Sequence, residues 1–156
     1  MKSKVVKSFT YKGLGFPVEL QKVKMLMIDG EWHPKIDVRK IADVVIESLV
    51  SQKERFTGNQ VKFIRTYFSM SLREFAENVV KESHTAVNKW EKSGNHVTNM
   101  DINIEKMLRL YISDVIYVKN RNQKVKFYEK YKELKNLSSS STVVNHLKII
   151  ITPLMA

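Results

Sequence analysis

The sequence predicts an α+β protein that is mainly α-helical and carries a small N-terminal antiparallel β module. Two observations lead to this fold class. Strand-forming residues gather between residues 5 and 36, and amphipathic segments with helix-capping residues follow from residue 37 to about residue 116. The chain has 156 residues, of which 43% are hydrophobic and 10% aromatic. This composition is sufficient for the core of one domain with a modest appendage.

The segment before residue 37 alternates strand formers with turn residues. VVKSFTY, FPVEL and VKMLMI are separated by glycines and Pro17, and the last run ends at Asp29-Gly30. An Asp-Gly pair between two alternating runs predicts a tight hairpin, because a primed turn needs positive φ at both positions. The short run EWHPK that follows contains Pro34, which restricts it to an edge strand or to the exit from the sheet.

Helices are predicted from cap residues and from apolar stripes with helical spacing. Asp37, Thr57, Ser71 and Ser83 each stand where a helix would begin, and a further helix starts near Asp101. Thr57 and Ser71 are followed three residues later by Gln60 and Glu74, which is the pattern of a capping box. The polar run SQKERF before Thr57 is predicted to be a linker. The stripes are Val38, Ile41, Ala42, Val45 and Leu49; Val61, Ile64, Tyr67 and Phe68; Leu72, Phe75, Ala76 and Val79; and Ile104, Met107, Leu108, Tyr111, Ile112 and Val115.

The segment SHTAVNKWEKSG, residues 83 to 94, separates into two faces when it is wound as a helix. One face holds Ala86, Val87 and Trp90. The opposite arc holds His84, Thr85, Asn88, Lys89 and Lys92. A helix-turn-helix needs a second helix that is held from behind by a few apolar contacts and is bare in front, since the front enters the DNA major groove. The alternative is an ordinary amphipathic surface helix, and in both cases Trp90 is expected in the core.

The charge of the chain favours a polyanionic partner. Twenty-seven basic residues against sixteen acidic ones leave a formal net charge of +11. The simpler alternative is a soluble protein that happens to be basic. Residues 119–135 are predicted to form a basic helix, either a phosphate-contacting surface or only a solvated face, with an apolar seam of Val125, Tyr128, Tyr131 and Leu134.

The C-terminal residues are predicted to contain a flexible link and a strand. SSSST, residues 138–142, has the composition of a linker. The run VVNHLKIIIT after it has strand composition and either pairs with the N-terminal strands or remains mobile.

Several functional classes are disfavoured by the residues that are missing. The chain has no cysteine, so it has no disulfide and no thiolate metal site. No signal peptide and no apolar run of the roughly 20 residues that span a bilayer is present, so we expect a cytoplasmic protein. Asp29, Glu31 and His33 alternate and could share a strand face as metal ligands, although a turn aspartate followed by exposed polar residues is the favoured interpretation. No nucleophile–base pair or phosphate loop stands out, so neither an enzyme nor a cofactor is expected.

The stretch MSLREFAENVVKESHTAVNKWEKSG resembles the helix-turn-helix of phage-repressor and Cro-like (XRE-type) regulators. The preceding TGNQVKFIRTYF looks like the first helix of that family, so the resemblance covers roughly residues 57–116, within a four- to five-helix domain. Two positions depart from the family pattern: the turn Val80-Lys81-Glu82 is one residue longer and lacks the usual glycine, and Leu72 replaces a common glutamine. The matching positions are Ser71, Glu74, Phe75, Ala76, Val79, Ser83, Val87, Trp90, Glu91 and Gly94.

The resemblance implies a set of DNA-contacting residues. Lysine can donate to guanine, asparagine can pair with adenine, and threonine can offer its hydroxyl or touch a thymine methyl. Amides at the start of the helix near Ser71 would hold a phosphate. The implied base contacts are His84, Thr85, Asn88 and Lys89, and the implied phosphate contacts are Ser71, Arg73, Lys92 and Ser93.

The order of the parts narrows the resemblance to MqsA-type and, more loosely, HigA-type antitoxins. The expected domains are residues 1–52, a β-rich module with one helix for partner or toxin binding; 53–118, the helix-turn-helix; and 119–156, a basic helix and tail. The MqsA-type N-terminal module typically binds zinc through cysteines, and this chain has none, so a zinc role is excluded.

The resemblance implies a repressor that binds a palindromic operator in double-stranded DNA as a homodimer, with a possible cognate toxin as partner. Met107, Tyr111 and Val115, or the C-terminal helix, would supply the dimer seam. The alternatives are a protein-interaction module and a stand-alone phage-type repressor with no toxin partner.

Overall fold

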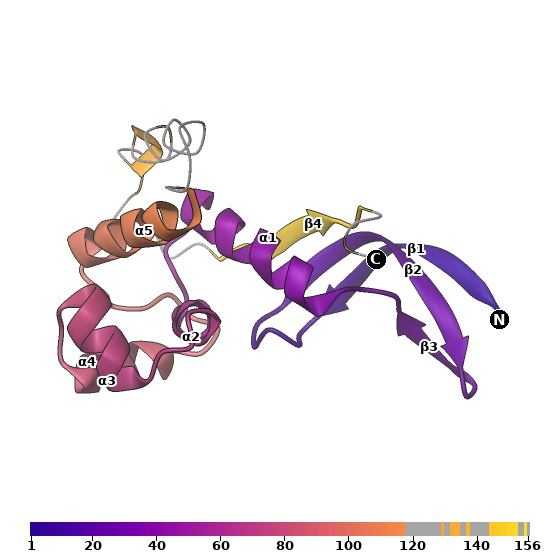
Figure 1. Cartoon of the computed structure of the whole chain (residues 1–156), viewed down its shortest axis with the longest axis horizontal. Coiled ribbons are helices and arrows are strands. Elements are labelled where there is room, and N and C mark those ends of the chain that lie inside the picture. Colours follow the sequence, from indigo (N-terminus) through magenta and orange to yellow (C-terminus); the bar gives the residue numbers. More distant parts are fainter. Residues whose placement is uncertain (118–128, 130–131, 135–136, 138–143, 153–154, 156) are drawn as a thin grey trace. The chain divides into compact units, whose positions relative to one another are not determined.

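A computed structural model describes residues 1–117, 129, 132–134, 137, 144–152 and 155, and it combines helices with a four-stranded sheet (Figure 1). This mixed architecture is consistent with the expected α+β class. The chain divides into two compact units, one formed by Met1–Val45 with His146–Ala156 and the other by Ile46–Asn145. Apart from residues 129 and 132–134, the expected basic helix 119–135 lies outside the described residues, as does the serine-rich link 138–142.

Strand β2 (Val18–Ile28) is the centre of the sheet. On one side it pairs antiparallel with β1 (Ser3–Tyr11), from Ser3↔Leu26 to Tyr11↔Val18. Its other side pairs antiparallel with β3 (Glu31–Pro34) near its end and parallel with β4 (Leu147–Ile150) near its start. The predicted hairpin is confirmed, because Asp29 and Gly30 both have positive φ, 49° and 85°. The C-terminal strand therefore pairs with the N-terminal strands, and it adds a parallel strand to a module that was expected to be purely antiparallel.

The first unit has a small apolar core under β2 and the start of α1 (Val38–Ser51). Asp37 caps α1, since its carboxylate accepts a hydrogen bond of 3.2 Å from the backbone N–H of Lys40, and this bond lowers the pKa of Asp37. Val38 was expected on the buried stripe but is 44% exposed, because burial along the helix begins one turn later at Ile41. The buried apolar residues of this unit are Phe16, Val18, Leu20, Val23, Met25, Ile41, Val45, Ile149 and Met155.

The second unit continues with α2 (Gly58–Tyr67), α3 (Leu72–Phe75), the π-helix η1 (Ala76–Val80), α4 (His84–Glu91) and α5 (Ile102–Tyr117). Both predicted capping boxes are present, at Thr57 with Gln60 and at Ser71 with Glu74. The Ser83 side chain caps α4 by accepting from the amide of Ala86 at 3.1 Å. No helix in the described part of the chain has the length and hydrophobicity that a membrane crossing needs.

Helix α5 buries only part of the apolar stripe that the sequence predicted. Leu108 and Ile112 are buried as expected, whereas Met107 and Val115 are 64% and 40% exposed. Glu105 and Arg109 are almost completely buried in their place. The prediction failed because a charged residue is normally assigned to the surface, and here each charge finds a buried partner.

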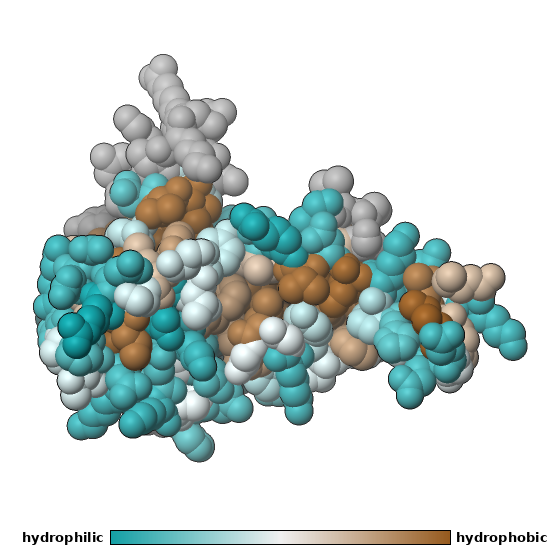
Figure 2. Space-filling model, turned by 60° about the horizontal axis from the view of Figure 1, so that its bottom comes forward, coloured by the Kyte–Doolittle hydropathy of each residue, from teal (hydrophilic) through white to brown (hydrophobic). Residues whose placement is uncertain are grey.

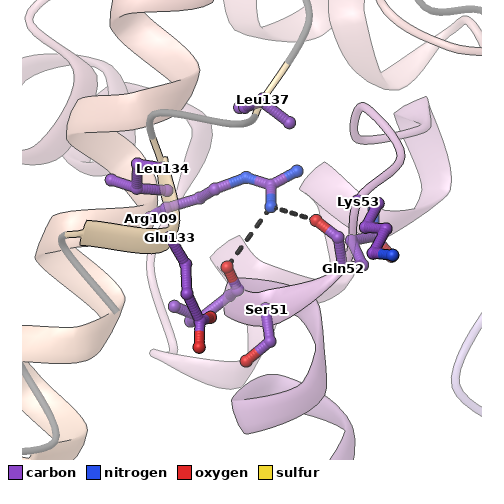
Figure 3. Close-up of a pocket in the computed structure, with 8 residues that line it drawn as sticks. Ser51, Gln52, Lys53, Arg109, Glu133, Leu134 and Leu137 are labelled. Atoms are coloured by element: carbon purple, nitrogen blue, oxygen red, sulfur yellow. Dashed lines mark hydrogen bonds between the residues drawn. The ribbon is translucent and has the colours of Figure 1, made fainter. Parts of the chain in front are cut away.

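The buried charges of α5 fix the segment that was predicted to be a polar linker. The Glu105 carboxylate accepts from the Arg55 guanidinium at 2.9 Å, from the Phe56 amide at 3.0 Å and from Arg109 at 3.0 Å. Arg109 also donates to the backbone carbonyl of Gln52 at 2.6 Å (Figure 3) and to that of Glu54 at 2.7 Å. Arg55 and Phe56 are therefore core residues, and SQKERF is a folded connection rather than a free linker.

Candidate functional site

The chain path from α3 to α4 explains how the unusual turn is accommodated. The residues after α3 wind as the π-helix η1, whose wider turn holds one more residue than an α-turn. Lys81, the C-cap residue after η1, has φ 56° and so adopts the left-handed conformation that glycine usually supplies. Lys81 and Glu82 both bond through their amides to the carbonyl of Ala76. The longer, glycine-free turn is thus compatible with two successive short helices.

Helix α4 is held from one side by its apolar residues. Val87 and Trp90 are buried, as the sequence predicted, and Ala86 is half-buried. α4 packs against α2, α3 and η1. An eight-residue helix has little intrinsic stability, so these contacts are what keep it folded.

The end of α4 lies very close to the start of α2. The amide of Asn59 donates to the carbonyl of Gly94 at 2.8 Å, and the amide of Gly58 donates to the carbonyl of His96 at 3.2 Å. A Cβ atom placed on Gly58 would lie only 2.5 Å from the carbonyl oxygen of Trp90. A residue without a side chain is therefore required at position 58.

A bidentate ion pair fixes the same end of α4. The guanidinium of Arg65 donates to the two carboxylate oxygens of Glu91 at 2.6 and 3.1 Å, and to the carbonyl of Met70 at 2.9 Å. It joins the last turn of α2, the last residue of α4 and the residue before the α3 cap. The sequence singled out Glu91 but gave no sign of Arg65, because nothing local marks two charges 26 positions apart as partners.

The predicted base-contacting residues lie on the opposite, exposed side of α4. His84, Thr85 and Lys89 are exposed and Asn88 is half-buried. Among the described residues, no side-chain hydrogen bond or ion pair engages any of the four. The surface over α3 and α4, at the left of Figure 2, is predominantly hydrophilic. The four side chains are thus free to meet an external ligand.

The predicted phosphate-contacting residues differ in exposure and in the hydrogen bonds they already make. Arg73 and Lys92 are exposed, and Ser93 is half-buried. The amide of Ser71, which was expected near a phosphate, already donates to the Glu74 carboxylate at 2.8 Å, and the Ser71 hydroxyl accepts from the Glu74 amide at 3.1 Å. The capping box therefore occupies two of the groups at the start of α3 and places a negative charge there.

Two further features of the chain lie outside this surface. A cavity of about 530 Å³ lies beside Arg109 (Figure 3), where the Nε atom of Arg109 is buried without a hydrogen-bond partner. Asp29, considered as a metal ligand with Glu31 and His33, belongs to the hairpin turn. Across the described residues, no group of three or more His, Cys, Asp or Glu side chains is arranged to hold a metal ion.

Comparison with models of known protein families, with curated proteins and with solved structures found no match for this chain. The resemblance to phage-repressor regulators therefore stays a prediction.

Proposed function

We propose that the protein is a sequence-specific DNA-binding transcriptional regulator in which α3, η1 and α4 form a helix-turn-helix. One observation carries the proposal: α4 is buried along Val87 and Trp90 and fixed at its end by Arg65–Glu91, while its opposite face is unengaged. A rigid helix with a free polar front has the arrangement that enters a major groove.

The free side chains have the chemistry for reading bases. Lys89 donates to guanine O6 or N7, and Asn88 pairs with adenine through its amide. Thr85 and His84 sit in the first turn of α4, the part of a recognition helix that contacts base edges most directly. Lys92, Ser93 and Arg73 supply phosphate contacts at either side. The exposed glutamates Glu74, Glu77 and Glu82 lie before α4, so the positive charge of this interface comes from α4 and its C-terminal end.

The regulator acts as a homodimer on a palindromic operator. One short helix reads only a few base pairs, so specificity requires two copies on half-sites about 34 Å apart. Met107 and Val115 are exposed on α5 beside the half-buried Tyr111 and form the candidate dimer surface. The order of a β-rich module followed by this helical unit supports a repressor of the antitoxin type, cytoplasmic and non-enzymatic, with a toxin as a further partner.

A protein-interaction module is the second candidate function. Strand β1 pairs only with β2 in the described part of the chain, so one of its edges is open to a strand from another protein. A gel shift with the DNA upstream of its own reading frame separates the two candidates, because only the regulator retards that DNA at moderate salt.

Binding-site selection with the purified protein first identifies an operator sequence. Substitutions on α4 then test the proposed interface against that operator. Lys89→Ala is expected to weaken operator binding by about 1–3 kcal/mol and to relax the preference at one base position. Lys92→Ala is expected to weaken binding to all DNA sequences alike. It should also lower the slope of log K against log[salt] by about one. Fluorescence anisotropy over a salt series measures both quantities.

Lys62→Ala is the matched control, because Lys62 is an exposed lysine of α2 that is not among the proposed DNA contacts. The proposed front face is wrong if the Lys89 and Lys92 variants bind every duplex as the Lys62 variant does.

A further inference from the structure

The hairpin formed by β1 and β2 (Figure 1) carries exposed lysines on both strands. Lys7 on β1 and Lys22 and Lys24 on β2 are all exposed. We call these three residues the ribbon lysines. They belong to the first unit, whereas α4 belongs to the second.

The backbone has an irregularity that places these lysines outside. On β2 the buried residues are Val18 and Leu20, then Val23 and Met25, so the alternation shifts by one residue at Lys22. Lys22 has φ 59°, the left-handed conformation, and the pairing with β1 keeps the same register on both sides of it. Strict alternation from Leu20 would have turned Lys22 and Lys24 toward the core. The shift turns them outward instead.

The same shift occurs on β1. Tyr11, Phe9 and Val6 are the less exposed positions, so Lys7 also leaves the inner face. The pairing of β1 with β2 skips one position, between Val6↔Val23 and Ser8↔Gln21. The register on both sides places Lys7 opposite Lys22 at this position. The alternation of inward and outward side chains therefore shifts at the same position on both strands, and each strand has a lysine there.

This arrangement is unfavourable for the isolated protein. Like charges directly opposite each other on a sheet repel, and a left-handed lysine is a strained backbone position. No ion pair among the described residues neutralises the ribbon lysines. The nearby carboxylate of Glu19 instead accepts a hydrogen bond of 3.0 Å from the Ser8 hydroxyl. By contrast, Lys4 on the same strand lies over the ring of Trp32, 4.2 Å from its centroid.

We propose that the ribbon lysines form a second phosphate-binding surface of the protein, with double-stranded DNA as its ligand. This inference rests on the proposed function and extends it to the first unit. A lysine ammonium is a compact charge on a flexible stem, suited to phosphates rather than to reading bases. Bound phosphates offset the repulsion between Lys7 and Lys22, and releasing counterions from the DNA favours the contact. The surface therefore adds affinity without sequence preference.

The test compares two variants of the full chain with equal loss of charge. The ribbon variant is Lys7→Gln/Lys22→Gln/Lys24→Gln. The control variant is Lys40→Gln/Lys53→Gln/Lys62→Gln, which removes three exposed lysines outside the sheet, on α1, before α2 and on α2. Both are titrated against the selected operator and against a mixed-sequence duplex of about 30 base pairs, long enough for two half-sites.

The ribbon variant is expected to bind both duplexes about tenfold or more weakly at low salt, with a salt slope lower by about two to three, while the control variant changes little. Its melting temperature should not fall below that of the control, because the substitutions remove repulsion. Equal affinity and slope for the two variants would overturn the inference and leave an acidic protein as the alternative ligand.

The outcome is distinguishable from failure of the proposed function. Lys89→Ala changes the base preference, which the ribbon variant leaves intact. If the Lys89 variant keeps its preference while the ribbon variant loses affinity, α4 is not the reading helix but the ribbon surface stands. If the Lys89 variant relaxes one base position and the ribbon variant matches its control, the regulator stands and the ribbon inference fails.

Discussion

At the scale of single residues, Glu105 shows how a charged side chain is accommodated in the core of the second unit. It is fully buried between Arg55 and Arg109 and also accepts from the Phe56 amide. Burial lowers the pKa of Arg109, and the carboxylate of Glu105 opposes this by favouring the charged guanidinium. Arg109 also stacks on Phe56, 4.5 Å from the ring centroid. One acidic side chain thus holds two buried cations and the segment before α2.

Glu105→Gln should therefore destabilise the protein strongly. The amide keeps the shape but removes the negative charge that pairs with two buried guanidinium groups, which costs about 3–5 kcal/mol. Urea unfolding followed by circular dichroism measures the loss. Glu77→Gln, which neutralises an exposed glutamate of η1, is the control and should change stability by less than about 0.5 kcal/mol. A similar midpoint for the two variants would contradict the assigned role of Glu105.

Residue patterns predicted the local features of this unit and missed the distant ones. Thr57, Ser71 and Ser83 were identified as caps because a cap and its partner lie within three residues of each other. The pairing of Arg55 with Glu105 spans 50 positions, and no periodicity encodes it. The exposed face of α4 could be predicted because helical spacing within one short segment determines it. The contact of Arg65 with Glu91 could not, because the two residues lie 26 positions apart.

At the scale of helices and strands, apolar periodicity located most elements but not their irregularities. The π-helix η1 and the shift at Lys22 each involve a lysine with positive φ, at positions where the sequence offers no glycine or asparagine as a signal. The run VKMLMI also gives no alternation from which the buried face of β2 could be read. Both irregularities lie beside surfaces that we propose contact DNA.

The close approach of α2 to α4 at Gly58 leads to a prediction at this scale. Gly58→Ala should destabilise the second unit by about 1–3 kcal/mol, because the new methyl group meets backbone atoms that cannot move aside easily. Alanine has the higher helix propensity, so an effect of propensity alone would have the opposite sign. Chemical denaturation decides between them, with Lys62→Ala on the exposed side of the same helix as control. A gain of stability in Gly58→Ala would show that the approach is looser than described.

At the scale of the whole molecule, the C-terminal strand determines how the chain is divided. The predicted boundaries placed residues 119–156 in one segment, whereas the structure groups residues 146–156 with residues 1–45. Composition identified β4 as a strand, but its partner is the start of β2, more than a hundred residues earlier. Such a pairing is non-local, so the sequence left open whether the tail pairs at all.

The division into two units predicts that damage to β4 stays within the first unit. Ile149 is buried, and Ile149→Ala should cost about 2–5 kcal/mol of the stability of the sheet. Its neighbour Ile150 is 53% exposed on the same strand, so Ile150→Ala is a matched control with little expected effect. Hydrogen exchange should show lost protection of β1 and β2 amides in the Ile149 variant, with α2 to α5 unchanged. Equal loss of protection in α2 to α5 would mean that the two units unfold as one cooperative body, and the first unit would then be unable to loosen while the second keeps its DNA-reading surface.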